Sequence, residues 1–463
     1  MESSDGGSSI PFIKARPLAD TEGMAEYRMR FFSLVFSYLM IVLVAPARAA
    51  DVDVMNILDD STLRASIAAT WFSEPLARVL ARRAEIRVLP SGERVQVRVE
   101  KGPAEFMVIL AREKEGAFPV HAQGSWVLYR RISDGAPTRV RIFPRSDPYM
   151  YVQLRSEAGG RAVLDAVAYG GYLVRSVMLP VEFPKVLEMP LERILAYAGD
   201  AFPRRYFEPH VQDYADARSL SAAVRGRLGE LVYADDAAID EAGINVPIAD
   251  RPAMGYGDKI GLNCSGFAKW VVDGILRPLT GRRLSIDALK KPPLERGSSF
   301  SEPFDADRDP YFGLDWTRNL AASAGSVLRG ARGADPAEYE VRSSPIVSLR
   351  VSGGDGGTSS TYPGYLKDAG FPLDGLKAIL YALAVDDPSW FYLASINEDR
   401  GSEPVLRQHF HVAVLIPQFE ENGLFRIAVF ESTVETDFDA FAARYPGRLA
   451  NLTRIPVETR FEP

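Results

Sequence analysis

The feature that most constrains the fold is a series of eight short segments, between about residues 85 and 180, in which apolar and polar residues alternate. Successive side chains of a β-strand point to opposite faces, so this period of two predicts strands with one buried face. Gly, Pro, Asp and Ser separate the segments, which include RVQVRVE, TRVRIF and YMYVQL. Such spacing favours an antiparallel sandwich or barrel. We therefore predict an all-β, sandwich-like or barrel-like domain over residues 51–185, whose role its residues do not indicate.

The periodicity changes after this region. Helical patterns such as LERILAYAG predict a helical connector over residues 186–250. Residues 251–463 open with a Gly-rich turn and a helix, and within them residues 281–370 contain loop-like, Gly-, Pro- and Ser-rich stretches that we interpret as an insertion. An overall α+β fold follows from this order of elements. The last part predicts three strands, at residues 390–397, 409–416 and 424–431.

The first 50 residues have the pattern of an export signal. Arg28 and Arg30 precede an apolar run, residues 31–46, that is followed by small residues. This order is typical of a secretory signal peptide, and the run is short for a membrane span, although a membrane anchor is the alternative. We expect residues 1–50 to be an N-terminal extension and signal peptide, and the mature chain to be periplasmic or extracellular without a stable membrane span.

The charge and the cysteine content narrow the possible functions. A net charge of -7 and a pI near 5.4 leave no basic surface for nucleic acid. Cys264 is the only cysteine, so the chain has no internal disulfide. An exported thiol is oxidised unless it is shielded or useful. Cys264 is therefore either a reactive nucleophile or a small buried apolar residue.

Cys264 lies at the predicted start of a helix. Asn263 before it is a good N-cap residue, and Pro278 is expected to end the helix. The backbone N–H groups of a first turn, with the positive end of the helix dipole, favour a thiolate and lower the pKa of the thiol. Ser265 and Gly266 follow, and the glycine predicts close approach of another chain segment or of substrate.

The segment NCSGFAKWVVD resembles the signature of the NlpC-type cell-wall peptidases, a bacterial branch of the papain-like cysteine hydrolases. The resemblance implies a papain-like domain over residues 251–463, with a nucleophile helix packed on an antiparallel sheet. It also implies that Cys264 is the nucleophile, with a histidine at the start of a later strand and a polar residue on the next strand. A tyrosine upstream of the cysteine lines the family's site, and Tyr256 is the candidate here. Asn263 replaces the family's usual aspartate.

The segment HFHVAVLIP resembles the family's histidine strand. His411 matches the histidine because an aliphatic run follows it directly. His409 lies two residues earlier, so both rings are expected on the same face of a strand, and position alone does not separate them. We favour His411 because it adjoins the buried run. His409 remains a candidate for binding substrate or the oxyanion, together with Ser265 and Tyr256.

Glu431 is the candidate third residue. If the hairpin loop is the three residues 421–423, with Gly423 in the left-handed conformation, Glu431 shares a face with His411. A two-residue turn would reverse this. The family commonly has His, Asn or Gln at this place, so a glutamate is a departure. A carboxylate can still accept the imidazole N–H and fix its tautomer. The alternative is a charge at a strand end.

The predicted function is an exported cysteine peptidase or amidase that hydrolyses peptidoglycan stem peptides through Cys264, His411 and Glu431, without metal or organic cofactor. The gap of 147 residues (411 minus 264) exceeds the family's usual gap, and we attribute the excess to the insertion at 281–370. A non-catalytic envelope-binding protein with a degenerate papain-like domain is one alternative. A lipid acyl hydrolase or transferase of related fold is another. A zinc site at His409 and His411 lacks a recognisable third ligand.

Overall fold

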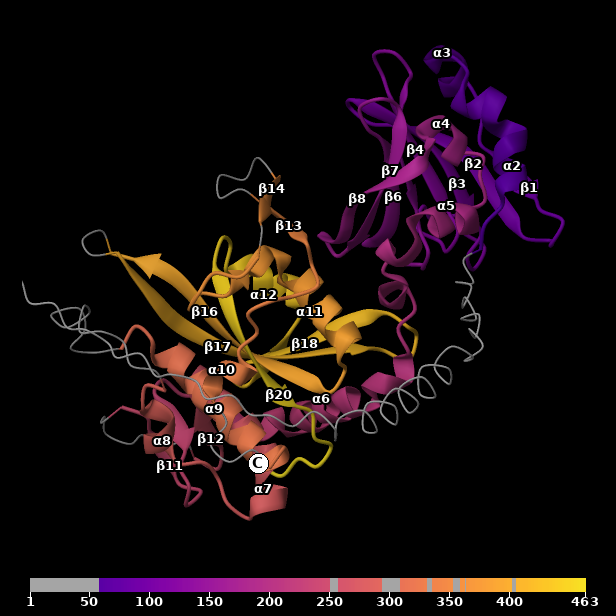
Figure 1. The fold of residues 1–463 in the computed structure, drawn as a ribbon. Helices are drawn as coiled ribbons and strands as arrows, with labels where there is room; N and C mark the ends of the chain where they lie inside the picture. Colours follow the sequence, from indigo (N-terminus) through magenta and orange to yellow (C-terminus); the bar gives the residue numbers. More distant parts are fainter. Residues whose placement is uncertain are drawn as a thin grey trace, which may run out of the picture. The chain divides into compact units, whose positions relative to one another are not determined.

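The computed structural model describes residues 58–249, 257–293, 309–330, 335–352, 359–362, 364–401 and 405–463 (Figure 1). Helices and mostly antiparallel sheets occur together in this part of the chain, so the α+β class is confirmed. The expected signal segment, residues 1–50, lies outside the described residues. Of the helices that the structure describes, none combines the length and the apolar character needed to cross a membrane.

The first sheet contains the eight strands that the alternating segments predicted. Each strand pairs antiparallel with the next, so β1 to β8 form one meander, and β13 and β14 extend it beyond β8. This differs from the predicted sandwich or barrel, because helices α4 and α5, and not a second sheet, cover one face. The alternation of apolar and polar residues shows that one face of the sheet is buried, but it does not identify the elements that cover this face. The bounds are β1 (Glu85–Val88), β2 (Arg94–Lys101), β3 (Glu105–Arg112), β4 (Trp126–Arg131), β5 (Pro137–Ile142), β6 (Met150–Ser156), β7 (Arg161–Ala168), β8 (Gly171–Glu182), α2 (Ser61–Ile67), α3 (Leu76–Leu80), α4 (Phe183–Val186) and α5 (Leu191–Ala198).

The connector is helical up to about residue 230, as the periodicity predicted, and its longest helix is α6 (Ala215–Arg227). Three short strands follow: β9 (Leu231–Tyr233), β10 (Ala237–Ile239) and β11 (Asn245–Pro247). β9 pairs in parallel with β12 (Ile260–Leu262), which leads directly into the cysteine helix. The sequence did not indicate these strands, because three residues are too few to show a period.

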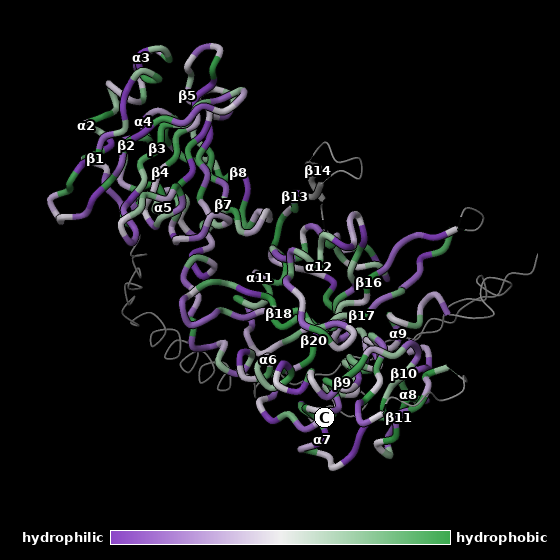
Figure 2. The backbone as a smooth tube through the Cα atoms, turned by 180° about the vertical axis from the view of Figure 1, so that it is seen from behind, coloured by the Kyte–Doolittle hydropathy of each residue, from purple (hydrophilic) through white to green (hydrophobic). Residues whose placement is uncertain are grey.

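The second large sheet has six strands in the order β15, β20, β16, β17, β18, β19. Its strands β16 to β18 are the three that the sequence predicted, and Figure 2 shows hydrophobic colouring along them. α7 and α9 lie on one side of this sheet, and α11 and α12 on the other (Figure 1). The bounds are α7 (Cys264–Thr280), α9 (Phe312–Leu328), α11 (Leu376–Asp386), α12 (Phe438–Arg444), β15 (Phe371–Pro372), β16 (Trp390–Arg400), β17 (Leu406–Phe419), β18 (Phe425–Glu431), β19 (Val434–Thr436) and β20 (Leu449–Pro456).

The segment interpreted as a loop-like insertion contains a core helix. α9 packs against α7, β16, β17 and β20, and its Trp316 and Leu320 are fully buried. Small residues in α9 weaken the helical pattern of its sequence. They also allow close packing, because a Cβ on Gly325 would lie 1.9 Å from the ring of Tyr339. The other elements described here are α8 (Ile286–Lys290), α10 (Pro336–Tyr339), β13 (Ser348–Ser352) and β14 (Ser359–Tyr362).

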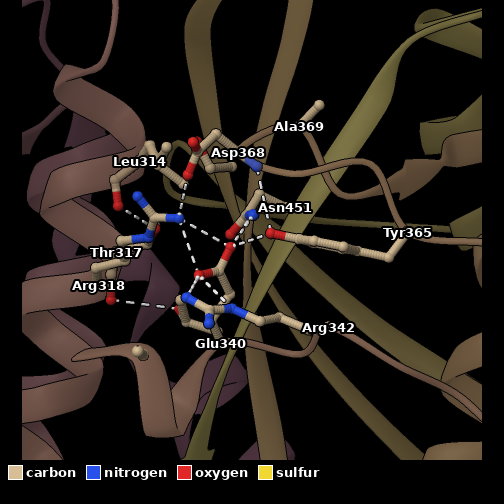
Figure 3. A network of polar contacts seen from close by, with 12 residues as sticks. Leu314, Thr317, Arg318, Glu340, Arg342, Tyr365, Asp368, Ala369 and Asn451 are labelled. Carbon is tan, nitrogen blue, oxygen red and sulfur yellow. Dashed lines mark hydrogen bonds and ion pairs between the residues drawn. The ribbon is translucent and has the colours of Figure 1, made fainter. Parts of the chain in front are cut away.

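A buried carboxylate fixes α9 to its surroundings (Figure 3). Both oxygens of Glu340 accept hydrogen bonds from Arg318 of α9 at 2.9 Å. The Tyr365 hydroxyl and the Asn451 amide of β20 each donate to Glu340 at 2.7 Å, and Arg318 also pairs with Asp368 at 2.7 Å. Because these partners come from separate segments, the network joins α9, β20 and the turn near residue 366 into one unit.

The same contacts lower the pKa of Glu340. Burial alone raises this pKa, but the hydrogen bonds from Tyr365 and Asn451 and the charge of Arg318 outweigh it and bring the pKa to about 2, from an ordinary value of 4.5. Since the pKa is lower in the folded state, the ionised group stabilises the fold fully above about pH 4.5. This contribution, about 3 kcal/mol, is lost as the pH falls towards 2.

We predict that Glu340→Gln lowers the free energy of unfolding by about 3 kcal/mol at pH 7, because it leaves the buried Arg318 with only part of its negative partners. Urea unfolding followed by circular dichroism measures the change. The difference from wild type should shrink as the pH falls from 4.5. Glu338→Gln, at an exposed position two residues earlier, is the control and should leave the midpoint unchanged. An equal midpoint for Glu340→Gln would contradict the prediction.

Candidate active site

The cysteine helix α7 begins at Cys264, where the sequence placed it. The Asn263 side chain accepts the N–H of Gly266 at 2.7 Å, so the predicted N-cap is confirmed. Asn263 also donates its own N–H to the carbonyl of Ala237 in β10, at 3.0 Å. The first turn of the helix, and the thiol with it, is therefore tied to a neighbouring strand.

The other end of α7 differs from the prediction. Pro278 lies within the last turn, and the helix continues to Thr280, where Gly281 follows in the left-handed conformation with a φ of 70°. A proline has no N–H for the helical carbonyl of Gly274. The N–H of Glu462 near the C-terminus donates to that carbonyl instead, at 2.8 Å, which makes the proline tolerable.

Gly266 is present for packing. A Cβ at this position would lie 2.1 Å from the carbonyl oxygen of Ala237. The close approach that the sequence predicted is therefore made by β10 of the same chain, and Gly266 carries no argument for substrate binding.

We predict that Gly266→Ala lowers the free energy of unfolding by about 2 kcal/mol, although alanine is the better helix former by about 1 kcal/mol, because the added methyl group must displace β10. Gly226→Ala is the matched control. Gly226 lies in α6 with no atom within 4 Å of its missing Cβ, so alanine should stabilise the chain there. Chemical denaturation measures both, and a gain in stability at Gly266 would contradict the packing argument.

The hairpin between β17 and β18 brings the third residue into place. The N–H of Glu420 donates to the carbonyl of Leu424 at 2.9 Å, which leaves a three-residue loop with Gly423 at a φ of 79°. A three-residue loop is the case in which the sequence predicts Glu431 on the same face of the sheet as His411. In the structure the Nε2 atom of His411 lies 2.7 Å from an oxygen of Glu431. Nδ1 is therefore the ring nitrogen left to face the thiol.

The thiol of Cys264 and the imidazole of His411 line the same cleft. Burial raises the pKa of Cys264, but the hydrogen bond and charge of His411 lower it, as do the backbone N–H of Val412 and the hydroxyl of Ser265. The net effect is a pKa below the ordinary value. β18 pairs with β17 only as far as the pair Val414–Phe430, so the sulfur can approach the backbone of Val412. Cys264 itself is partly exposed.

His409 does not share the arrangement of His411. A β-bulge lies at this point, because Ile396 and Asn397 of β16 pair with His411 and His409, and Phe410 is the extra residue. The bulge breaks the alternation from which the same face was expected. The Nδ1 atom of His409 instead lies 2.9 Å from the hydroxyl of Ser395. His409 lines the cleft but is not bonded to the thiol through that nitrogen.

A cleft of about 490 Å³ opens at the thiol. The predicted candidates that line it are Cys264, Ser265, His409 and His411. Tyr256 lies outside the described residues. The sequence did not indicate the contributions of Phe312 from α9 or of the segment near residue 235, because both were interpreted as connecting structure. Further lining residues are Tyr233, Asp235, Asp236, Lys290, Asp309, Gln408, Phe410 and Ser432.

Within the described ranges, no three His, Cys, Asp or Glu side chains are placed to hold a metal ion. His409 and His411, the pair considered from the sequence, are bonded to Ser395 and Glu431 respectively.

We predict that His411→Gln raises the pKa of Cys264 and slows its alkylation by iodoacetamide at pH 6 by about tenfold or more, because the thiolate loses the imidazole that lowers its pKa. Since Cys264 is the only cysteine, all labelling reports on this site. The control is His409→Gln, whose rate should follow that of wild type across pH. Identical profiles for His411→Gln and wild type would show that the imidazole does not activate the thiol.

Comparison with known proteins finds a match only for the first part of the chain. A family model described as a domain of unknown function (DUF8515) matches residues 53–206. The match includes the strands β1 to β8 and ends before α7, so the thiol and the histidine lie outside it. No curated protein matched the chain. No solved structure matched it.

Proposed function

We propose that this chain is an exported cysteine peptidase or amidase, with a papain-like C-terminal domain, that hydrolyses amide bonds in the stem peptides of peptidoglycan. One observation carries the proposal: a cysteine at a helix N-terminus shares a cleft with an imidazole that lowers the pKa of its thiol, and the Nε2 atom of that imidazole lies 2.7 Å from a carboxylate oxygen. This order of nucleophile, base and orienting group is that of a covalent hydrolase.

In the first step, His411 takes the proton of Cys264 and the thiolate attacks the carbonyl carbon of the scissile amide. A carbon–sulfur bond forms, and the electron pair of the carbonyl moves to its oxygen. The N–H groups of the first turn of α7 face this oxyanion and stabilise its charge; losing one such donor typically costs about a hundredfold in rate. The carboxylate of Glu431 accepts a hydrogen bond from the Nε2–H group, which holds the imidazolium in place.

In the second step, the imidazolium of His411 protonates the nitrogen of the leaving amine as the carbon–nitrogen bond breaks, which leaves a thioester on Cys264. Water then attacks the thioester, and His411 takes its proton. The carbon–sulfur bond breaks, and the acid product leaves with the thiolate restored. The reaction needs these side chains and water only.

The cleft and the motif favour a peptide substrate. An ester of an acyl chain would react by the same steps. Four charged side chains, Asp235, Asp236, Lys290 and Asp309, line the cleft, and this lining suits a charged, polar substrate better than an acyl chain. The likeness of NCSGFAKWVVD to the NlpC-type signature points to peptidoglycan stems, and export by the expected signal peptide would place the enzyme beside them.

We predict that the mature protein cleaves purified muropeptides and that Cys264→Ala loses at least about 10³-fold in kcat/KM, because no other group replaces the nucleophile. Mass spectrometry of the products identifies the bond that is cut. Acyl esters tested in parallel distinguish a lipid hydrolase.

The controls decide between the proposal and a binding protein with an inactive domain. Cleavage by both wild type and Cys264→Ala would assign the activity to another group or to a contaminant. Cleavage by neither, with retained muropeptide binding, would favour the binding protein. A folded Cys264→Ala, checked by circular dichroism, is required for either conclusion.

A further inference from the structure

The C-terminal end of α12 reaches the candidate site, although no motif marks it in the sequence. The helix is held by Phe438 and Phe441, which are buried, and by Asp437, whose side chain caps its first turn. These contacts fix the direction of the short helix. Its last residue, Arg444, and the following Tyr445 lie next to Glu431 and His411.

Arg444 and His411 bind the two oxygens of the same carboxylate. The Nη2 atom of Arg444 contacts Oε1 of Glu431, and Nε2 of His411 lies 2.7 Å from Oε2. The side chain of Glu431 is only 3% exposed, whereas that of Arg444 is 49% exposed. A carboxylate this deeply buried requires a partner for its charge. Arg444 supplies that partner from the solvent side and leaves the second oxygen to the imidazole.

The ring of Tyr445 packs against another side of the His411 imidazole. Its ring centroid lies 5.6 Å from that of His411, with 31° between the ring planes. Phe410 packs on the same tyrosine at 5.9 Å. Burial and the charge of Cys264 raise the pKa of Tyr445, against the opposing effect of Arg444, so this ring stays neutral beside the thiol. The imidazole is thus held at Nε2 by Glu431 and along one face by Tyr445.

We propose that Arg444 is a positioning residue that acts on Cys264 through Glu431 and His411. The arrangement is a series of four side chains, in which the arginine fixes the carboxylate, the carboxylate fixes the imidazole, and the imidazole activates the thiol. The inference rests on the proposed function for its effect on catalysis. Its structural part, the effect of Arg444 on the bond between His411 and Glu431, is measurable without any substrate.

Kinetics with muropeptides test the catalytic effect. Arg444→Gln should lower kcat by about tenfold with KM unchanged, because a misplaced base affects the reaction and not the binding of substrate. Arg444→Lys retains the cation and should recover most of that loss. In the background of Glu431→Gln, replacing Arg444 should cost nothing further, because residues that act as one unit are not additive.

Arg448→Gln is the matched control. Arg448 is 41% exposed, lies four residues after Arg444, and pairs with Glu398 of β16 and not with Glu431. Loss of this exposed ion pair should leave kcat at the wild-type value. Wild-type kcat in Arg444→Gln, or losses that multiply in the double variant with Glu431→Gln, would overturn the proposal. So would a loss in Arg444→Lys equal to that in Arg444→Gln. If the glutamine variant does not fold, a loss of about tenfold in kcat of Arg444→Lys overturns the proposal.

Nuclear magnetic resonance tests the structural part. The chain has four histidines, so selective ¹⁵N-histidine labelling gives a simple spectrum, and His411→Gln assigns the Nε2–H signal of His411. In wild type and Arg448→Gln this proton should resonate far downfield and exchange slowly. In Arg444→Gln it should move upfield or broaden. An unchanged signal would overturn the proposal even if the enzyme is active. If wild type cleaves no muropeptide, the proposed function fails while this signal still decides the role of Arg444.

Discussion

The candidate site depends on the position of the thiol of Cys264 beside the imidazole of His411, two groups that the chain brings into one cleft from distant positions. This position requires the N-terminus of α7 to meet β17 where β18 leaves it. Two backbone features hold the ends in place: Asn263 and Gly266 seat the first turn against β10, and the hairpin loop between β17 and β18 puts Glu431 on the face of His411. The bulge at Phe410 separates the direction of His409 from that of His411.

Buried polar groups keep the supporting elements in one arrangement. Within α7, Lys269 and Asp273 form a fully buried ion pair at 2.6 Å, and the same ammonium donates to the carbonyl of Ile239 in β10. Glu340 connects α9 to β20 in a similar way, through Arg318 and Asn451. Such pairs stabilise little relative to a well-packed apolar core, but each is satisfied in only one geometry. They therefore restrict how α7, α9 and the sheet fit together, and the position of the thiol relative to the imidazole follows from that fit.

The candidate site belongs to one of the two large sheets and not to the other. The family match covers strands β1 to β8 of the first sheet and no residue of the thiol site. The described chemistry belongs to the second sheet with α7, α9 and α12. In that sheet the central strand β17 is buried from Val412 to Phe419, which gives the imidazole a rigid support on one side of the cleft.

Local patterns in the sequence determined much of this structure. The period of two predicted the eight strands of the first sheet, and Asn263 predicted the start of α7. Each of these depends on neighbours in the chain. The sequence left the length of the hairpin loop open between two and three residues, and the structure has the three-residue loop that places Glu431 beside His411. What covers the first sheet, the core position of α9, the divergence of His409 from His411 and the reach of Arg444 to Glu431 were decided by tertiary structure. They depend on packing between distant segments, on one bulged residue and on the direction of a short helix, and no local pattern of residues carries that information.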